Sequence, residues 1–370
     1  MSKKTLIVVG VLGLFGVVAY IGFPELAKDA LFYPDAPEAN YPEPADEAEA
    51  RLQDLQHLEH YVRGYDRSYH FRARGRALAR IEELKGSAAS LSPAGFELAI
   101  SEIVAMGENG HSNVWSGPRS RRHPSMPFFG YSFDDGYYIV AATPDHAGLL
   151  GTKVTHIGNG PLSDLKSAYR RFYGGEDSGY LAYSLPYLVQ NTAFLKELGF
   201  IQDAFRPSLT VTRHDGGVET LQLSALPAQE DRQANWPWDW LISETQEDPQ
   251  FVRFRNGQNH RPIYLASTKA FQIVRIDAAQ APLVQYRQNY DSEKRISQFN
   301  DEVRAAIAQF RPRALIVDQR FNGGGDYTKT AGLMFDMPEM LPTGTRVYAI
   351  TGPETFSAGI SSLGFLKEAL

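Results

Sequence analysis

Three consecutive glycines between two apolar stretches constrain this 370-residue chain more than any other feature. The glycines at 323–325 follow the β-branched run Ala314–Asp318, which is typical of a buried strand. Three glycines in a row do not suit the interior of a helix or strand, so the strand must end in a loop. A helical pattern at 327–335 and a second strand pattern at 346–350 follow. This order predicts an α/β fold.

Ser357 stands where the second strand pattern gives way to a final apolar helix. A hydroxyl group at a helix N-terminus lies close to N–H groups that stabilise developing negative charge. The glycine loop of the neighbouring strand would bring another N–H group close to a substrate carbonyl. The alternatives are that Ser357 is a plain N-cap and that the glycines form only a loop. Both features together, on adjacent strands, predict a serine hydrolase, and more narrowly a peptidase.

Composition excludes several other classes of protein. The net charge of −6, with no basic stripe, argues against a nucleic-acid partner. The absence of cysteine excludes disulfides, zinc–thiolate sites and thiol catalysis. His57 and His60 have a spacing that a metal site could use, but they fall on a solvated helix pattern, so the sequence predicts no metal and no cofactor.

The N-terminus predicts a membrane anchor. Residues 5–23 form an apolar run of nineteen residues after two lysines, and a helix of that length spans roughly 28 Å, close to the thickness of a bilayer core. With Glu25 and Asp29 after the run, we expect a single-pass anchor over 1–24, a cytoplasmic N-terminus and a periplasmic or extracellular body. A cleaved signal peptide, which would leave the body secreted, is the alternative.

The rest of the chain divides by pattern. Proline, alanine and acidic residues at 25–49 predict a semi-rigid linker, and helical periodicity over 50–115 predicts a helical cap. Alternating residues within 124–225 predict a β module, a loop-rich connection follows at 226–261, and α/β patterning fills 262–370. The strands predicted in the β module are Phe128–Phe133, 137–142, Lys153–Ile157 and 209–212. The elements predicted before the glycine loop are strands at Ile263–Leu265 and Phe271–Ile276 and a helix at Ile296–Phe310.

His111 is the best-placed candidate for a general base. It follows the third helix pattern of the predicted cap, in the segment Glu108-Asn-Gly-His-Ser-Asn-Val-Trp115. Gly110 leaves the backbone free to present the imidazole ring. The alternative is an ordinary loop histidine.

Four motifs in this order resemble those of the carboxy-terminal-processing (tail-specific) serine peptidases, nearer to the branch of the tricorn core and interphotoreceptor retinoid-binding protein. Asn109-Gly-His-Ser112 resembles the element that ends the helical cap, and residues 151–162 resemble the PDZ-like module. Residues 318–325 resemble the glycine loop, and residues 355–359 resemble the nucleophile segment. The resemblance implies a crotonase-like catalytic domain with an N-terminal helical cap and a PDZ-like β module, here behind a single predicted transmembrane helix.

The resemblance also implies roles for individual residues. Ser357 would attack the scissile carbonyl and His111 would take its proton. The backbone N–H groups of Gly324 and Ala358 would form the oxyanion hole, with Gly323 as the substitute donor. The residues expected to shape the site are Asp318 and Arg320, which brace the loop, Asn322, which shapes the glycine turn, and Gly325.

Two departures from the family pattern bear on activity. Simpler tail-specific enzymes pair the serine with a downstream lysine, but Lys367 lies ten residues along the same predicted helix, roughly 15 Å away along its axis. The tricorn-like branch adds a carboxylate beyond the serine helix, and this sequence ends at Leu370, within that helix by pattern. We therefore expect either a fragment of a longer protein or a shortened protein with an incomplete site.

The functional hypothesis is a membrane-anchored serine endopeptidase that acts on peptides or proteins. One alternative is a catalytically impaired, membrane-tethered peptide-binding protein of the same fold. Another is an acyl-CoA enzyme, because a crotonase-like fold also hosts that chemistry. The sequence does not predict the oligomeric state.

Overall fold

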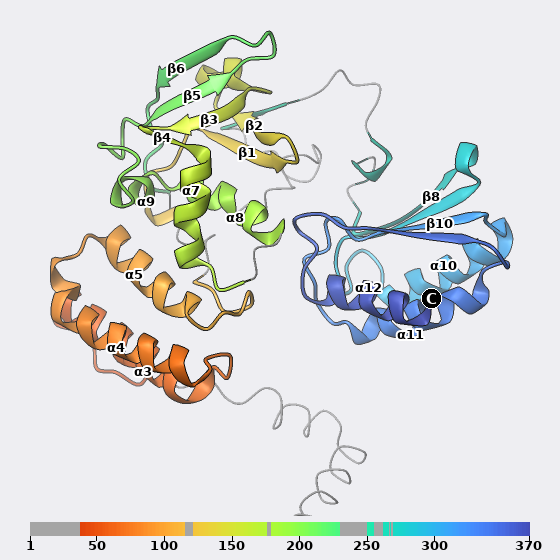
Figure 1. The fold of residues 1–370 in the computed structure, drawn as a ribbon, viewed down its shortest axis with the longest axis horizontal. Coiled ribbons are helices and arrows are strands. Elements are labelled where there is room, and N and C mark those ends of the chain that lie inside the picture. The colour runs from red at the N-terminus through yellow and green to blue at the C-terminus, as the bar shows by residue number, and fades with distance from the viewer. Residues whose placement is uncertain are drawn as a thin grey trace, which may run out of the picture. The chain divides into compact units, whose positions relative to one another are not determined.

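The computed structural model describes residues 38–114, 121–175, 179–229, 250–254, 262–265, 267 and 269–370, drawn as a coloured ribbon in Figure 1. The described residues form two compact units. The first consists of the described part of Met1–Ser92 with Met106–Glu108, and the second of Pro93–Ala105 with the described part of Asn109–Leu370. The domain boundaries predicted from sequence stay predictions, and much of 226–261 lies outside the described residues.

The predicted membrane location requires correction. Within the described residues, no helix combines the length and the apolar character needed to cross a membrane. The predicted anchor at 5–23 lies outside the described residues. This finding contradicts the predicted single-pass location, which was inferred from the apolar run and the charges on either side of it, and no described helix supports a membrane partner.

The first unit is built on two long helices, α3 (Glu47–His60) and α4 (Phe71–Ser87). A π-helical turn (Tyr61–Tyr65) follows α3, and a 3-10 turn (Ala88–Ser90) follows α4. Helix α3 begins where the side chain of Asp46 accepts a hydrogen bond from the Glu49 backbone N–H at 2.9 Å. The apolar spacing predicted from sequence faces the interior, where the buried side chains include Leu55, Leu58, Val62, Ala77, Ile81 and Leu84.

The second unit contains a seven-stranded sheet with the strand order β1-β2-β3-β5-β6, in which β4 pairs with β3 and β7 pairs with β2. Its strands are β1 (Phe128–Phe133), β2 (Gly136–Ala142), β3 (Lys153–Ile157), β4 (Gly160–Pro161), β5 (Ser208–Thr212), β6 (Val218–Gln222) and β7 (Val252–Arg253). The accompanying helices are α5 (Pro93–Ala105), α7 (Leu162–Tyr169), α8 (Gly179–Gln190) and α9 (Thr192–Glu197), with 3-10 turns at Pro144–Leu149 and Arg170–Phe172. Side chains from these helices and from the sheet share one apolar core.

The four strands predicted in this region are confirmed to within a residue, while β6 and the two-residue strands β4 and β7 were missed. Helices α8 and α9 are separated by a single residue. That residue is Asn191, whose side chain accepts a hydrogen bond from the Phe194 N–H at 3.1 Å and so caps α9.

A second sheet of four strands has the order β11-β10-β9-β8. Its strands are β8 (Phe271–Ile276), β9 (Ala281–Tyr286), β10 (Ala314–Asp318) and β11 (Arg346–Ile350). Its helices are α10 (Ile296–Phe310), α11 (Thr328–Met340) and α12 (Ala358–Ala369), with a 3-10 turn at Asp277–Ala279. Figure 1 shows the three helices on one face of this sheet, where an apolar core joins them to the strands.

The sequence pattern missed β9, a fully buried inner strand of this sheet. It pairs antiparallel with β8 and parallel with β10. Pro282 is the second residue of β9, and a proline in a strand pattern normally argues against an inner strand. Conversely, Ile263–Leu265, predicted as a strand, is a 3-10 turn.

Candidate active site

The parallel pairing of β10 with β11 brings the two candidate loops together. Asp318, the last residue of β10, lies in register with Ile350, the last residue of β11. The glycine loop therefore leaves the same edge of the sheet as the segment that leads to Ser357. In open α/β sheets the carboxyl ends of parallel strands are where ligands commonly bind.

Ser357 has an unusual backbone conformation at the start of α12. Its φ is 51° and its ψ is −122°, and its side chain makes no capping hydrogen bond to the helix. A plain serine N-cap has an extended backbone and uses its hydroxyl group to accept from the helix N–H groups. A non-glycine residue with positive φ costs free energy, and such strain concentrates at functional sites. The N-cap alternative therefore does not describe this serine.

The glycine loop packs directly against Ser357. A Cβ atom built on Gly324, whose φ is +113°, would lie 2.7 Å from Ser357 Cβ and 3.3 Å from the Ala358 backbone nitrogen. A side chain does not fit at that distance, so glycine is required here for close approach. Gly359 makes the reciprocal contact, because its added Cβ would lie 2.7 Å from the Asn322 carbonyl oxygen. The two loops therefore contact each other through backbone atoms.

Asn322 holds the glycine loop and the serine turn in one arrangement. Its buried side chain accepts a hydrogen bond from the Gly324 N–H at 2.9 Å and donates to Asn289 Oδ1 at 2.7 Å. Its own carbonyl oxygen accepts a hydrogen bond from the Phe356 N–H at 2.9 Å. Asn289 in turn donates to the hydroxyl groups of Thr330 and Ser362.

These bonds bear on the predicted oxyanion donors. The Gly324 N–H is already bonded to Asn322, so Gly324 supplies space beside Ser357 rather than a free donor. Among the described residues, no acceptor is bonded to the backbone N–H groups of Gly323 or Ala358. The substitute donor Gly323 therefore fits the geometry better than Gly324. Gly325 packs elsewhere, with an added Cβ 2.7 Å from the Asn289 carbonyl carbon.

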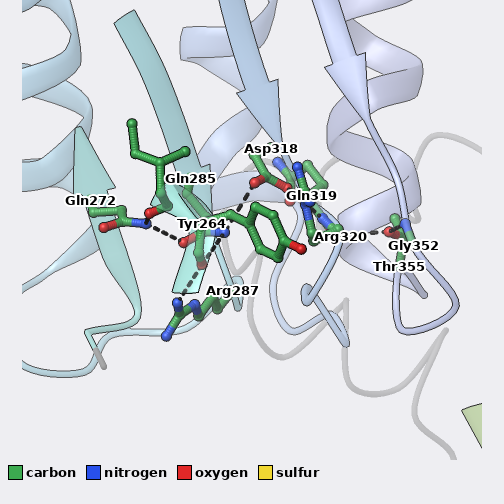
Figure 2. Close-up of polar contacts among 10 residues, drawn as sticks. Tyr264, Gln272, Gln285, Arg287, Asp318, Gln319, Arg320, Gly352 and Thr355 are labelled. Carbon is green, nitrogen blue, oxygen red and sulfur yellow. Dashed lines mark hydrogen bonds and ion pairs between the residues drawn. The ribbon is translucent and has the colours of Figure 1, made fainter. Parts of the chain in front are cut away.

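Asp318 and Arg320 form a brace behind the loop (Figure 2). Oδ1 of the fully buried Asp318 accepts from the Arg320 backbone N–H at 3.0 Å and from Arg320 Nε at 2.9 Å. Oδ2 accepts from Gln285 Nε2 at 3.0 Å. The Arg320 guanidinium lies 3.8 Å from the centroid of the Tyr264 ring, a cation–π contact. With all these partners, Asp318 and Arg320 stabilise the loop.

Thr355 joins the two loops from the other side. Its hydroxyl group donates to the Gln319 carbonyl oxygen at 2.8 Å and accepts from the Gly352 N–H at 2.9 Å, as Figure 2 shows.

Arg287 donates to the Tyr264 carbonyl oxygen at 2.9 Å, and burial lowers the pKa of its guanidinium to about 10.

His111 lies beside the residue that precedes the serine. Its exposed ring stacks on Phe356 with a centroid separation of 4.4 Å and an angle of 34° between the planes. The Asn109 side chain fixes its backbone by accepting from the His111 N–H at 3.0 Å. Among the hydrogen bonds of the described residues, none joins the imidazole to Ser357. The structure thus places His111 next to the serine turn without the hydrogen bond of a formed dyad.

Glu354, three residues before Ser357, was not among the predicted site residues. It is 3% exposed, and its Oε1 accepts a hydrogen bond from the Tyr131 hydroxyl of β1 at 2.5 Å. Burial raises the pKa of this carboxyl group to about 7 against the lowering effect of the Tyr131 hydrogen bond. Glu354 precedes the serine, whereas the family pattern predicts a carboxylate that follows it. The signal available in the sequence is a lone acid in the turn Gly352-Pro-Glu-Thr-Phe-Ser357.

The residues of the site have no arrangement that favours a metal. No group of three or more histidine and acidic side chains suited to a metal ion occurs within the part of the chain that the structure describes. The chemistry available to the site is that of a hydroxyl group, backbone N–H groups and an imidazole.

Several solved structures are similar to this chain. Mature CPAF in complex with lactacystin matches at 13% identity and a TM-score of 0.47, with 78% of this chain and 59% of that chain covered. The photosystem II D1 C-terminal processing protease matches at 11% identity and a TM-score of 0.31, with coverage of 88% and 79%. The tricorn protease matches at 12% identity and a TM-score of 0.30, with coverage of 87% and 29%.

The chain spans about three-fifths of the length of the CPAF structures that it matches. No protein-family model matches the chain, and no curated protein matches it. At these identities and TM-scores, the likeness decides neither the family nor the tricorn branch.

Proposed function

We propose that this protein is a serine peptidase of the tail-specific type, with Ser357 as the nucleophile and a peptide or protein as the substrate. The observation that carries the proposal is the strained backbone of Ser357, whose hydroxyl group is not used as a helix cap and which lies against Gly324. The crotonase-like catalytic domain, the PDZ-like module and the tricorn-like branch belong to the same proposal.

The proposed reaction begins with attack of Ser357 Oγ on the scissile carbonyl carbon. His111 takes the hydroxyl proton, and the backbone N–H groups of Gly323 and Ala358 donate to the resulting oxyanion. Collapse of the tetrahedral intermediate breaks the C–N bond, and His111 returns the proton to the leaving amine. Water, activated by His111, then hydrolyses the acyl-enzyme and restores the serine.

The proposed role of His111 requires its ring to move. Its ring stacks on Phe356, adjacent to Ser357, and is exposed. Catalytic hydrogen bonds in ligand-free enzymes are often long and tighten only when substrate binds. The proposal requires the ring to leave Phe356 and move to the hydroxyl group when substrate binds. A non-catalytic peptide-binding protein is the second candidate, and the absence of a formed Ser357–His111 bond favours it.

A fluorophosphonate probe separates the two candidates because it forms a covalent bond only with an activated serine. We expect labelling of the wild-type chain and none of Ser357→Ala. We expect His111→Ala to slow labelling by at least about 100-fold, while His146→Ala, an exchange in the 3-10 turn Pro144–Leu149, leaves it unchanged. Folded wild-type protein that does not react with the probe would support the binding protein instead.

A further inference from the structure

Glu354 is a buried carboxyl group for which the proposed reaction has no use. It lies in the turn between β11 and α12, three residues before Ser357. Its Oε1 accepts from the Tyr131 hydroxyl at 2.5 Å. Its Oε2 is buried and has no hydrogen-bond partner within the described structure. A carboxylate held this way lacks most of the donors that its charge requires.

The groups that face this pair come from three elements. Tyr131 comes from β1 and is 8% exposed. Arg320 of the glycine loop and Tyr264 of the 3-10 turn at Ile263–Leu265 both act electrostatically on Tyr131. Arg320 is 2.9 Å from Asp318, so its charge is largely compensated there. Among the described groups, Tyr131 is the side chain that stabilises an ionised Glu354.

The protonation state of Glu354 therefore matters for the turn. A neutral carboxyl group can stay buried with one hydrogen bond to Tyr131. An ionised one needs water or further donors, because burial disfavours the charged form. Water can reach Oε2 only if the turn or β1 moves away. That turn also fixes Phe356, whose N–H donates to the Asn322 carbonyl oxygen at 2.9 Å, and through it Ser357.

We propose that Glu354 is a positioning residue. Its neutral carboxyl group, hydrogen-bonded to Tyr131, holds the turn that presents Ser357, and its deprotonation loosens this turn and slows reaction at Ser357. The proposal rests on the proposed function in that Ser357 is the reacting group. It also makes β1 a support of the serine turn.

The first test compares fluorophosphonate labelling rates on both sides of pH 7. Glutamine stays neutral at every pH, and all other titrating groups are the same in both chains. Dividing the Glu354→Gln rate by the wild-type rate therefore removes the pH dependence that those other groups cause. We expect this ratio to rise about tenfold as the pH rises through about 7, the equivalent of one misplaced hydrogen bond. Tyr131→Phe removes the bond that favours the ionised carboxyl, so in this variant the loss of labelling shifts to higher pH. A purely structural role would move neither the ratio nor the midpoint.

A second measurement keeps the proposal separate from the proposed function. Amide hydrogen exchange of the segment 352–359 is compared in Ser357→Ala and in Ser357→Ala/Glu354→Gln, neither of which can react. We expect faster exchange in the chain that retains Glu354 as the pH rises through about 7. Equal exchange together with a flat labelling ratio would overturn the positioning role while leaving the nucleophile intact. If the wild type is not labelled but the exchange difference is clear, the proposed peptidase activity is contradicted, while the effect of Glu354 protonation on the turn is supported.

Discussion

The two sheets of the second unit differ in the kinds of side chain that they bury. The seven-stranded sheet packs apolar side chains such as Ile139, Leu195 and Val211 into one core. The four-stranded sheet also has an apolar core, but at its strand ends it buries a connected polar network. The completely or almost completely buried members of that network include Gln285, Asn289, Asp318, Gln319, Asn322, Thr330 and Ser362. The first arrangement resists unfolding, while the second fixes the positions of individual atoms.

The largest effect should follow from a single methyl group in the glycine loop. Gly324→Ala places a Cβ 2.7 Å from Ser357 Cβ, on a backbone with a φ of +113°. We expect fluorophosphonate labelling to fall by at least about 100-fold, since a displacement near 1 Å costs that much. The matched control is Gly332→Ala in α11, which meets no atom within 4 Å and should stabilise the fold by about 0.5–1 kcal/mol. Equal labelling in the two variants would mean that the close approach of Gly324 to Ser357 is not needed for the reaction.

A cavity in the core of the seven-stranded sheet should have the opposite effect: it should lower stability without slowing labelling. Ile139 is fully buried in β2, so Ile139→Ala should lower the free energy of unfolding by about 2–5 kcal/mol. Labelling per folded molecule should not change. Urea unfolding combined with labelling of the folded fraction measures both quantities, and a loss of labelling beyond the loss of folded protein would contradict this view.

Glu354 and Tyr131 connect the two regions, and the burial of the Glu354 carboxyl group, which raises its pKa, gives the protein a pH dependence. The folded-state pKa of Glu354, about 7, lies above its ordinary value of 4.5, so the folded state binds the proton more tightly than the unfolded chain. Stability from this group is therefore fully present below pH 4.5 and is lost as the pH rises towards 7. Relative to Glu354→Gln, the wild type should lose up to about 1.4 kcal/mol per pH unit in that window. A constant difference between the two unfolding curves would contradict the raised pKa.

A pair of asparagine variants gives the smallest and most direct contrast. Asn289→Ala removes bonds to Asn322, Thr330 and Ser362 and should cost about 1–3 kcal/mol, with slower labelling as well. Asn191→Ala removes the cap of α9 beside the other sheet and should cost about 1 kcal/mol. Labelling of the folded Asn191→Ala protein should stay at the wild-type rate. Thermal unfolding and probe labelling report the two effects separately.

Local patterns predicted most of the elements on which the site stands. The strand patterns predicted β1, β2, β3 and β5. Burial alternates along β5, whereas β1 is buried on both faces except at its last residue. The strand–glycine–helix–strand–serine order is also local and lies where it was predicted. Pattern failed at β9, where Pro282 and the buried Gln285 break the apolar signal that normally marks an inner strand.

The parts of the site that sequence did not predict depend on contacts between distant residues. Asn289 bonds to Asn322 across 33 positions, and Tyr131 bonds to Glu354 across 223. None of these four residues is of an unusual type for its position in the sequence, so no local pattern marks the two contacts. The oxyanion assignment changed for a local reason instead: the Asn322 side chain accepts a hydrogen bond from the Gly324 N–H two residues away, so this N–H group is not free.

The backbone of Ser357 has a consequence for how this protein can change over time. A φ of 51° with a ψ of −122° suits glycine, so Ser357→Gly would relax the chain and raise its melting temperature while removing the hydroxyl group. A lineage that used the protein only as a scaffold would gain stability from that one exchange. A serine at a position where glycine would cost less free energy is expected only where its hydroxyl group is used.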